Sequence, residues 1–140
     1  MQKTTLISAL MLAAFAAPAF AEGDIAKGEA DFKKCKACHA IVADDGTEIQ
    51  KGGKVGPNLY GVMGRQIGSL PDFKYGESTV AAGADGTVWT EDLLVAYLAD
   101  PSAWLKEKLS DPAAKSKMSF KLAKGGEDMA AYLASVKPAQ

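Results

Sequence analysis

The stretch Cys-Lys-Ala-Cys-His, residues 35–39, limits what this chain can fold around more than any other feature of its sequence. Two cysteines three residues apart and an adjacent histidine can bind a metal ion, exchange a disulfide or hold a larger cofactor. A zinc site normally needs four protein ligands, but the chain holds two cysteines and one histidine in all. A thioredoxin-like pair would lie near a β-α-β pattern, and none is visible. A structural disulfide would leave His39 unexplained.

Covalent haem attachment accounts for all three residues, because Cys-x-x-Cys-His is the signature of c-type haem. Residues three apart lie on the same face of a helix, so both thiols can add to the two vinyl groups on one edge of a porphyrin. His39 can then direct its imidazole to the iron. We therefore predict one covalently attached haem c, bound through Cys35 and Cys38, with His39 as an iron ligand.

The first 21 residues have the pattern of a secretory signal peptide. A basic start at Lys3 precedes an apolar run and the small residues that end at Ala21, as in cleaved leaders. An uncleaved anchor is the alternative, but the run is short for a span of about 20 apolar residues. Removing 21 of the 140 residues leaves 119, which suits a single domain over residues 22–140. We expect a periplasmic protein.

Most of the remaining chain indicates helices joined by long loops. Asp24 and Thr90 can cap helices, and Asp100-Pro101 ends one helix and can start another. The expected helices cover residues 24–39, 77–82, 90–99, 101–105 and 125–137, and residues 43–73 are expected to be loop. Gly28 would allow the first and last helices to approach closely near Tyr132. We predict an all-α domain of about four to five helices wrapped around one haem.

Three methionines outside the leader could provide a second axial ligand: Met63, Met118 and Met129. Met129 lies on the apolar stripe of the last predicted helix and is better explained as core. Met63 lies in a tight loop before Gly64. Met118 lies in Lys-Ser-Lys-Met-Ser-Phe, which has no helical pattern and could carry a thioether across the haem face. We favour Met118.

Taken together, these segments resemble the class I c-type cytochromes, in particular the cytochromes c2 of purple photosynthetic bacteria. The resemblance extends from Glu22 to Lys137 and rests on the segments KGEADFKKCKACH, GPNLYGVMGR, FKYGES, the Trp89 segment, AYLADP, KSKMSF and DMAAYLASV. The extra residues around ADDGTEIQKGG, and those between Trp104 and Lys117, match the larger bacterial members.

The resemblance implies a role for each residue around the haem. Cys35 and Cys38 would form the thioethers, and His39 and Met118 would bind the iron. The Pro57 carbonyl would hold the second ring nitrogen of His39, and Tyr97 would approach the Met118 sulfur. The groups expected near the haem propionates are Arg65, Tyr75, Trp89 and Ser116.

Two axial side chains leave no open position on the iron, which argues against an enzyme and for a one-electron carrier. The resemblance implies that it takes electrons from the cytochrome bc1 complex and delivers them to a photosynthetic reaction centre or to a terminal oxidase such as cytochrome c oxidase. A haem enzyme or gas sensor with a labile sixth ligand is the rival class. A periplasmic thiol-disulfide protein would need free thiols.

The charge pattern predicts how such a carrier would dock. Without the leader, 15 basic and 17 acidic side chains leave a net charge of −2, so a general nucleic-acid binder is not expected. Residues 75–105 contain five acids and no Lys or Arg, whereas residues 106–124 contain six lysines and two acids. The residues predicted to dock a partner are Lys33, Lys34, Lys36, Lys117, Lys121 and Lys124. We expect a monomer that binds membrane complexes transiently.

Overall fold

The structure is a computed structural model and describes residues 23–138. The predicted signal peptide therefore lies outside the described residues. The helices are α1 (Ile25–Asp31), α2 (Glu77–Gly83), α3 (Glu91–Ala99), α4 (Pro101–Leu109) and α5 (Gly126–Ser135), with a 3-10 turn at Phe32–Lys34. The two strands are β1 (Ile41–Val42) and β2 (Glu48–Gln50).

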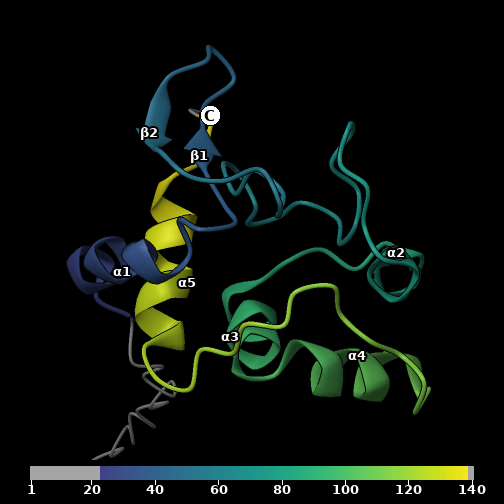
Figure 1. Cartoon of the computed structure of the whole chain (residues 1–140). Helices are drawn as coiled ribbons and strands as arrows, with labels where there is room; N and C mark the ends of the chain where they lie inside the picture. The colour runs from purple at the N-terminus through teal and green to yellow at the C-terminus, as the bar shows by residue number, and fades with distance from the viewer. Residues whose placement is uncertain (1–22, 139–140) are drawn as a thin grey trace, which may run out of the picture.

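The first and last helices pack against each other through a glycine, as predicted (Figure 1). Asp24 caps α1 by accepting a hydrogen bond from the Lys27 amide. Gly28 faces α5 so closely that a Cβ placed there would lie 2.0 Å from the Asp128 carbonyl oxygen and 2.7 Å from the Tyr132 Cβ. Next to this crossing, the Phe32 and Tyr132 rings meet edge to face at 6.0 Å. Only glycine permits such an approach at this position.

Helices α3 and α4 begin at the predicted caps. The Thr90 hydroxyl accepts from the Leu93 amide at the start of α3, and Asp100 accepts from the Ala103 amide at the start of α4. Helix α4 runs to Leu109, four residues beyond the expected end, and stops where Ser110 adopts a left-handed conformation with φ 50°. Helix α5 buries Met129, Tyr132 and Leu133, as the apolar stripe predicted.

Two local expectations were wrong. Residues 48–50 were expected to be loop, but they pair with β1 in a short antiparallel hairpin turned at Gly46. Strands of two and three residues are too short to show an alternating pattern. The first helix was expected to continue through His39, but α-helical geometry ends at Asp31. The cysteines follow in a turn, in which the amides of Cys38 and His39 both donate to the Cys35 carbonyl.

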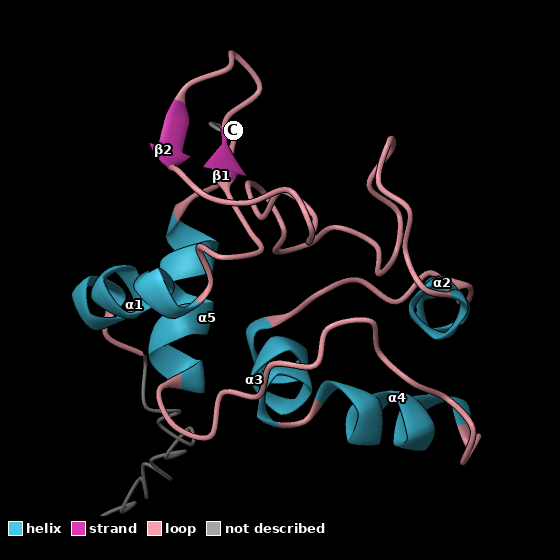
Figure 2. Ribbon diagram, viewed as in Figure 1, coloured by secondary structure: helices cyan, strands magenta, loops and turns pink. Residues whose placement is uncertain are grey.

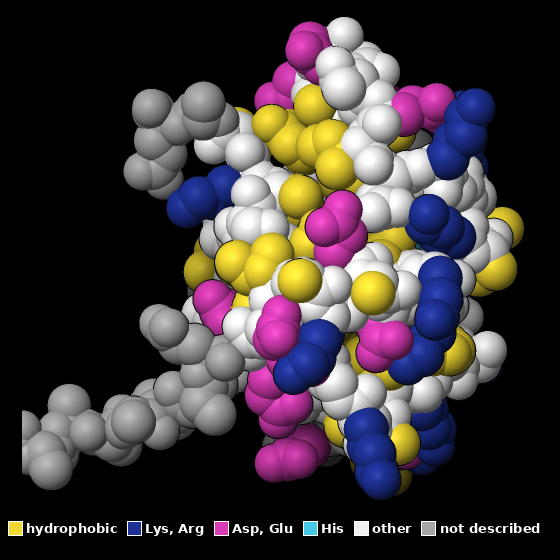
Figure 3. All heavy atoms as spheres, turned by 90° about the vertical axis from the view of Figure 1, so that its left-hand side faces the viewer, with side chains coloured by type: hydrophobic (Ala, Val, Ile, Leu, Met, Phe, Trp, Pro, Cys, Tyr) yellow, Lys and Arg dark blue, Asp and Glu magenta, His cyan; other side chains and the backbone are white. Residues whose placement is uncertain are grey.

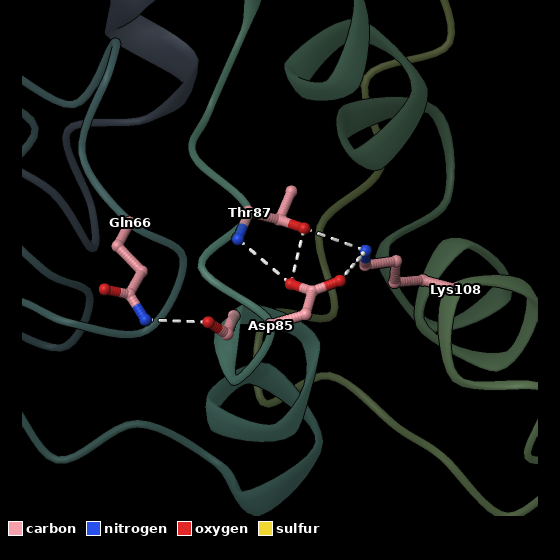
Figure 4. Close-up of polar contacts among 5 residues, drawn as sticks. Gln66, Asp85, Thr87 and Lys108 are labelled. Atoms are coloured by element: carbon pink, nitrogen blue, oxygen red, sulfur yellow. Dashed lines mark hydrogen bonds and ion pairs between the residues drawn. The ribbon is translucent and has the colours of Figure 1, made fainter.

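In Figure 2 the helices lie along the left, the bottom and the right of the view, and the chain between β2 and α2 crosses the top as a long loop. Loop 64–67 runs beside residues 87–89, joined by bonds from the Gly64 amide to the Trp89 carbonyl and from the Trp89 amide to the Arg65 carbonyl. A polar cluster ties the turn after α2 to α4 (Figure 4). There Lys108 Nζ donates to both Asp85 and Thr87 at 2.9 Å. These contacts fix the segments that carry the predicted site residues.

Candidate functional site

The two cysteines are available for covalent attachment. They do not form a disulfide with each other; Cys35 is half-buried against the core and Cys38 is exposed. Burial raises the pKa of the Cys35 thiol, only partly offset by Lys34. Within residues 23–138 no group of three or more His, Cys, Asp or Glu side chains is placed to hold a metal ion. The motif therefore offers two thiols and one imidazole, the donor set of a c-type haem and not of a zinc site.

His39 is the buried polar residue of the motif, with 9% of its surface exposed. Its Nδ1 lies 2.8 Å from the Pro57 carbonyl oxygen, the partner predicted for it. A carbonyl can only accept, so Nδ1 carries the proton and Nε2 is left unprotonated in the neutral ring. Burial lowers the pKa of the ring, which favours that neutral form. Such a ring is prepared to bind a metal through Nε2.

Glycines allow the backbone to close around His39. A Cβ on Gly56 would lie 2.3 Å from the His39 Cε1, and one on Gly52 would lie 1.9 Å from the His39 carbonyl oxygen. Neither contact is compatible with a side chain. The glycine-rich stretch that was expected to be loop is therefore packed against His39, with Gly52 on its main chain and Gly56 on its ring.

Asn58 holds the loop that follows Gly56 and Pro57, and the sequence analysis did not identify this residue. Its amide group pairs with both backbone groups of Val42, at 3.0 and 2.7 Å, and its Oδ1 also accepts from the Tyr60 amide. Arg65 donates to the Asn58 carbonyl at 3.0 Å and is half-buried, which lowers its pKa. The asparagine lies in the GPNL segment, but its bonding cannot be read from that motif.

Trp89 and Tyr97 come together in an aromatic cluster that also includes Trp104. Their rings lie 5.1 Å apart, and Trp104 lies 5.6 Å from each of them. Trp104 had been assigned only to the short helix. Tyr75 lies apart from this cluster and packs edge to face on Phe73 at 4.8 Å.

Met118 is half-buried against the core, in the loop between α4 and α5. Its amide donates to the Ser116 hydroxyl at 3.0 Å, and that hydroxyl lies 2.9 Å from the Tyr97 hydroxyl. The structure thus brings together Met118, Tyr97 and Ser116. Met129 is 1% exposed and belongs to the core, as predicted. Met63 lines a surface pocket of about 360 Å³ together with Trp89 and Lys137.

The predicted docking lysines are all exposed, but two of them are neutralised locally. Lys34 pairs with Asp31 at 3.0 Å and Lys121 with Asp100 at 2.6 Å. The Lys117 ammonium donates only to a backbone carbonyl, at 3.3 Å. No ion pair of Lys33, Lys36 or Lys124 occurs within the part of the chain that the structure describes. In Figure 3 basic side chains form a column along the right-hand edge of the face, and most acids lie to its left.

Among residues 23–138, no helix is long and apolar enough to cross a membrane. No protein-family model matches the chain.

Comparison with known proteins gives close relatives over most of the sequence. The chain is 64% identical to cytochrome c2 of Rhodobacter capsulatus over 130 residues, which cover 93% of this chain and 92% of the relative. The crystal structure of that cytochrome c2 superposes with a TM-score of 0.80 at 65% identity, covering 81% of this chain and 98% of the other. Ferric cytochrome c-550 of Paracoccus versutus superposes with a TM-score of 0.81 at 54% identity, covering 84% and 100%.

These similarities confirm the predicted all-α fold and the family resemblance. They also support the general role of electron carrier, since the relatives are cytochromes of that kind. The two cysteines, which are not in a disulfide, and the buried imidazole suit the same cofactor. The chain belongs to the cytochrome c2 family of class I c-type cytochromes and carries one covalently attached haem c.

Proposed function

We propose that this protein is a periplasmic one-electron carrier in which His39 and Met118 are the axial ligands of the haem iron. The observation that carries the proposal is the His39 ring, whose Nδ1 is held by the Pro57 carbonyl so that Nε2 is left as an acceptor, in the same turn as two cysteines that are not in a disulfide. When bound, the haem supplies reversible exchange of one electron between the ferrous and ferric states.

The residues in the turn at 35–39 and those packed against it have different roles in holding the haem. Cys35 and Cys38 hold the porphyrin edge through thioethers, and the turn at residues 35–39 sets their separation. The Pro57 carbonyl fixes the tautomer of His39 and increases its basicity as a ligand. Gly56 lies directly against the imidazole and limits its rotation, while Gly52 packs on the backbone carbonyl of His39.

Met118 fits the role of second ligand because its loop is attached to the aromatic cluster through Ser116 and Tyr97. A thioether ligand and burial both favour ferrous iron and raise the reduction potential. If His39 and Met118 both bind the iron, no position would remain for oxygen or peroxide, which favours a carrier over the rival haem enzyme or gas sensor.

Substitution of the three methionines tests the ligation. Met118→Ala should remove the near-infrared band that marks a methionine on ferric iron, lower the potential and let carbon monoxide bind the ferrous form. Met63→Leu and Met129→Leu, which keep an apolar side chain of similar size, serve as matched controls and should retain the band. A Met118→Ala protein that keeps the band, or a Met63→Leu protein that loses it, would refute the assignment.

Location and partners form a second part of the proposal. The leader at residues 1–21 supports export, and the mass of protein purified from the periplasm should correspond to a chain that begins at Glu22. Membership of the cytochrome c2 family supports the cytochrome bc1 complex as electron donor, and a photosynthetic reaction centre or cytochrome c oxidase as acceptor. Reduction by isolated bc1 complex, with oxidation by each acceptor, tests these partners directly.

The exposed lysines support docking on acidic surfaces of those complexes. Complementary charge raises association rates at low salt and loses its effect as the Debye length falls to about 10 Å or less. Lys117 has no carboxylate partner among residues 23–138, whereas Lys121 is paired with Asp100. We therefore expect Lys117→Glu to slow electron transfer at low salt more than Lys121→Glu does, and Glu91→Lys to change it little. A rate that does not depend on salt would contradict docking by these lysines.

A further inference from the structure

The first turn of α4 contacts the Met118 loop on both sides of the methionine. The loop, residues 110–125, has no helix or strand. In Figure 1 it returns from the end of α4 past α3 to α5. Two side chains of this turn form hydrogen bonds to the loop. Ser102 bonds to Ser116, which lies two residues before Met118 in the sequence, and Asp100 bonds to Lys121, which lies three residues after it.

The Ser102 contact is part of a chain of hydrogen bonds that ends at Met118. The Ser102 hydroxyl accepts from the Ser116 amide at 3.0 Å. The Ser116 hydroxyl in turn accepts from the Met118 amide at 3.0 Å and bonds to the Tyr97 hydroxyl at 2.9 Å. These groups are partly buried, so a lost partner is only incompletely replaced by water. Ser102 therefore holds the backbone of Ser116, and Ser116 holds the backbone of Met118.

The Asp100 contact joins the two elements by charge. Asp100 Oδ1 caps α4 by accepting from the Ala103 amide at 3.0 Å, and its Oδ2 accepts from Lys121 Nζ at 2.6 Å. The Leu122 amide donates to the Leu98 carbonyl at 2.8 Å beside this pair. The Lys121 side chain is 59% exposed and that of Asp100 is 37% exposed, so the ion pair is open to screening by salt.

We propose that Ser102 and Asp100 are positioning residues that clasp the Met118 loop and set how often Met118 leaves the iron. The proposal rests on Met118 as axial ligand, as proposed above. Opening of a loop without secondary structure is opposed only by its side-chain contacts and hydrogen bonds. Of these, the Ser102 contact is made before Met118 in the sequence and the Asp100 contact after it, and both side chains come from the first turn of α4.

Displacement of Met118 by imidazole in the ferric holoprotein measures the opening. At saturating imidazole, the rate at which the near-infrared band disappears equals the rate at which the methionine leaves the iron. Ser102→Ala should accelerate it about tenfold, the factor expected for an unpaired, partly buried amide. Ser102→Thr keeps the hydroxyl and should stay within about twofold of the parent. Ser119→Ala changes an exposed serine of the same loop, which makes no hydrogen bond within residues 23–138, and should have no effect.

The salt dependence of the displacement rate distinguishes the Asp100 contact from the Ser102 contact. Asp100→Asn retains a good helix cap and removes the charge, so displacement should be about two- to fivefold faster than in the parent at low salt. In about 1 M salt, where the Debye length is about 3 Å, the parent should approach the Asp100→Asn rate. The effect of Ser102→Ala should persist in high salt, because it involves no ion pair.

The outcomes distinguish the two proposals. A parent that has no methionine band, or whose band survives in Met118→Ala, would overturn the ligation itself. A parent with that band, and Ser102→Ala and Asp100→Asn displacement rates equal to that of Ser119→Ala, would overturn only the clasp. Amide hydrogen exchange of the unaltered holoprotein gives an independent measurement. The Ser116 amide should exchange more slowly than the Ser119 amide, and equal rates would also overturn the Ser102 contact.

Discussion

Replacing Gly28 by alanine tests the packing of the first helix on the last. A Cβ at this position would lie 2.0 Å from the Asp128 carbonyl oxygen and 2.7 Å from the Asp128 carbonyl carbon. Real Cβ atoms essentially never come closer than 3.0 Å to such atoms. Because the obstructing atoms belong to the backbone, no change of rotamer relieves the contact. The two helices have to separate by about 1 Å, the difference between 3.0 and 2.0 Å.

Two opposing effects decide the result. Alanine in place of glycine stabilises a helix by about 1 kcal/mol through its propensity. Overpacking a tight contact costs about 1–3 kcal/mol and occasionally more, and a separation of this size weakens dispersion contacts along the interface. Here it also affects the Phe32–Tyr132 pair and the 2.7 Å bond from the Asp24 amide to Asp128. We expect the overpacking cost to reach about 3 kcal/mol, and the net loss of unfolding free energy to be about 2 kcal/mol.

Guanidinium unfolding of the ferric holoprotein, followed by circular dichroism, measures this loss. The matched control is Ala26→Gly, at an exposed position of the same helix, which reports the propensity effect alone and should cost about 1 kcal/mol or less. A Gly28→Ala protein as stable as the parent, or more stable, would show that propensity dominates and that the close crossing does not exist in solution.

Three further predictions follow from single contacts. Ser110→Gly should raise the unfolding free energy by about 0.5 kcal/mol in chemical denaturation, because Ser110 has φ 50° and glycine adopts this conformation without steric cost. Asp85 accepts from Thr87 and Lys108, which holds its pKa well below the ordinary 3.8. Its stabilisation is therefore present above the unfolded pKa and is lost as pH falls through the lower folded pKa. Asp85→Asn should therefore flatten the acid side of the stability–pH profile; Asp44→Asn, at an exposed aspartate that makes no hydrogen bond within residues 23–138, is the comparison variant. Cys38→Ala should lower the haem absorbance per mass of purified protein sharply; colourless protein that remains folded would show that the fold does not depend on haem.

Parts of the fold were predictable because their signals are local. Asp24, Thr90 and Asp100 cap helices through bonds to amides three residues ahead, and the sequence alone shows such spacings. The buried stripe of α5 follows from helical periodicity. The hairpin of Ile41–Gln50 and the early end of α1 were not predictable. The hairpin has strands too short for a pattern, and the residues after α1 satisfy bonds within the turn that carries the two cysteines.

The chemistry of this protein could be predicted from its amino-acid sequence. Two cysteines, one histidine and three methionines outside the predicted signal peptide are few possible donors, and the spacing of Cys35, Cys38 and His39 indicates haem among the cofactors. The way in which those donors are held depends on the folded structure. The fold placed the Pro57 carbonyl against His39, closed glycine backbone around that residue, and brought Ser102 and Asp100 to the Met118 loop. These contacts join residues 14 to 21 positions apart, and no local pattern encodes such pairs because they depend on the packing of separate elements.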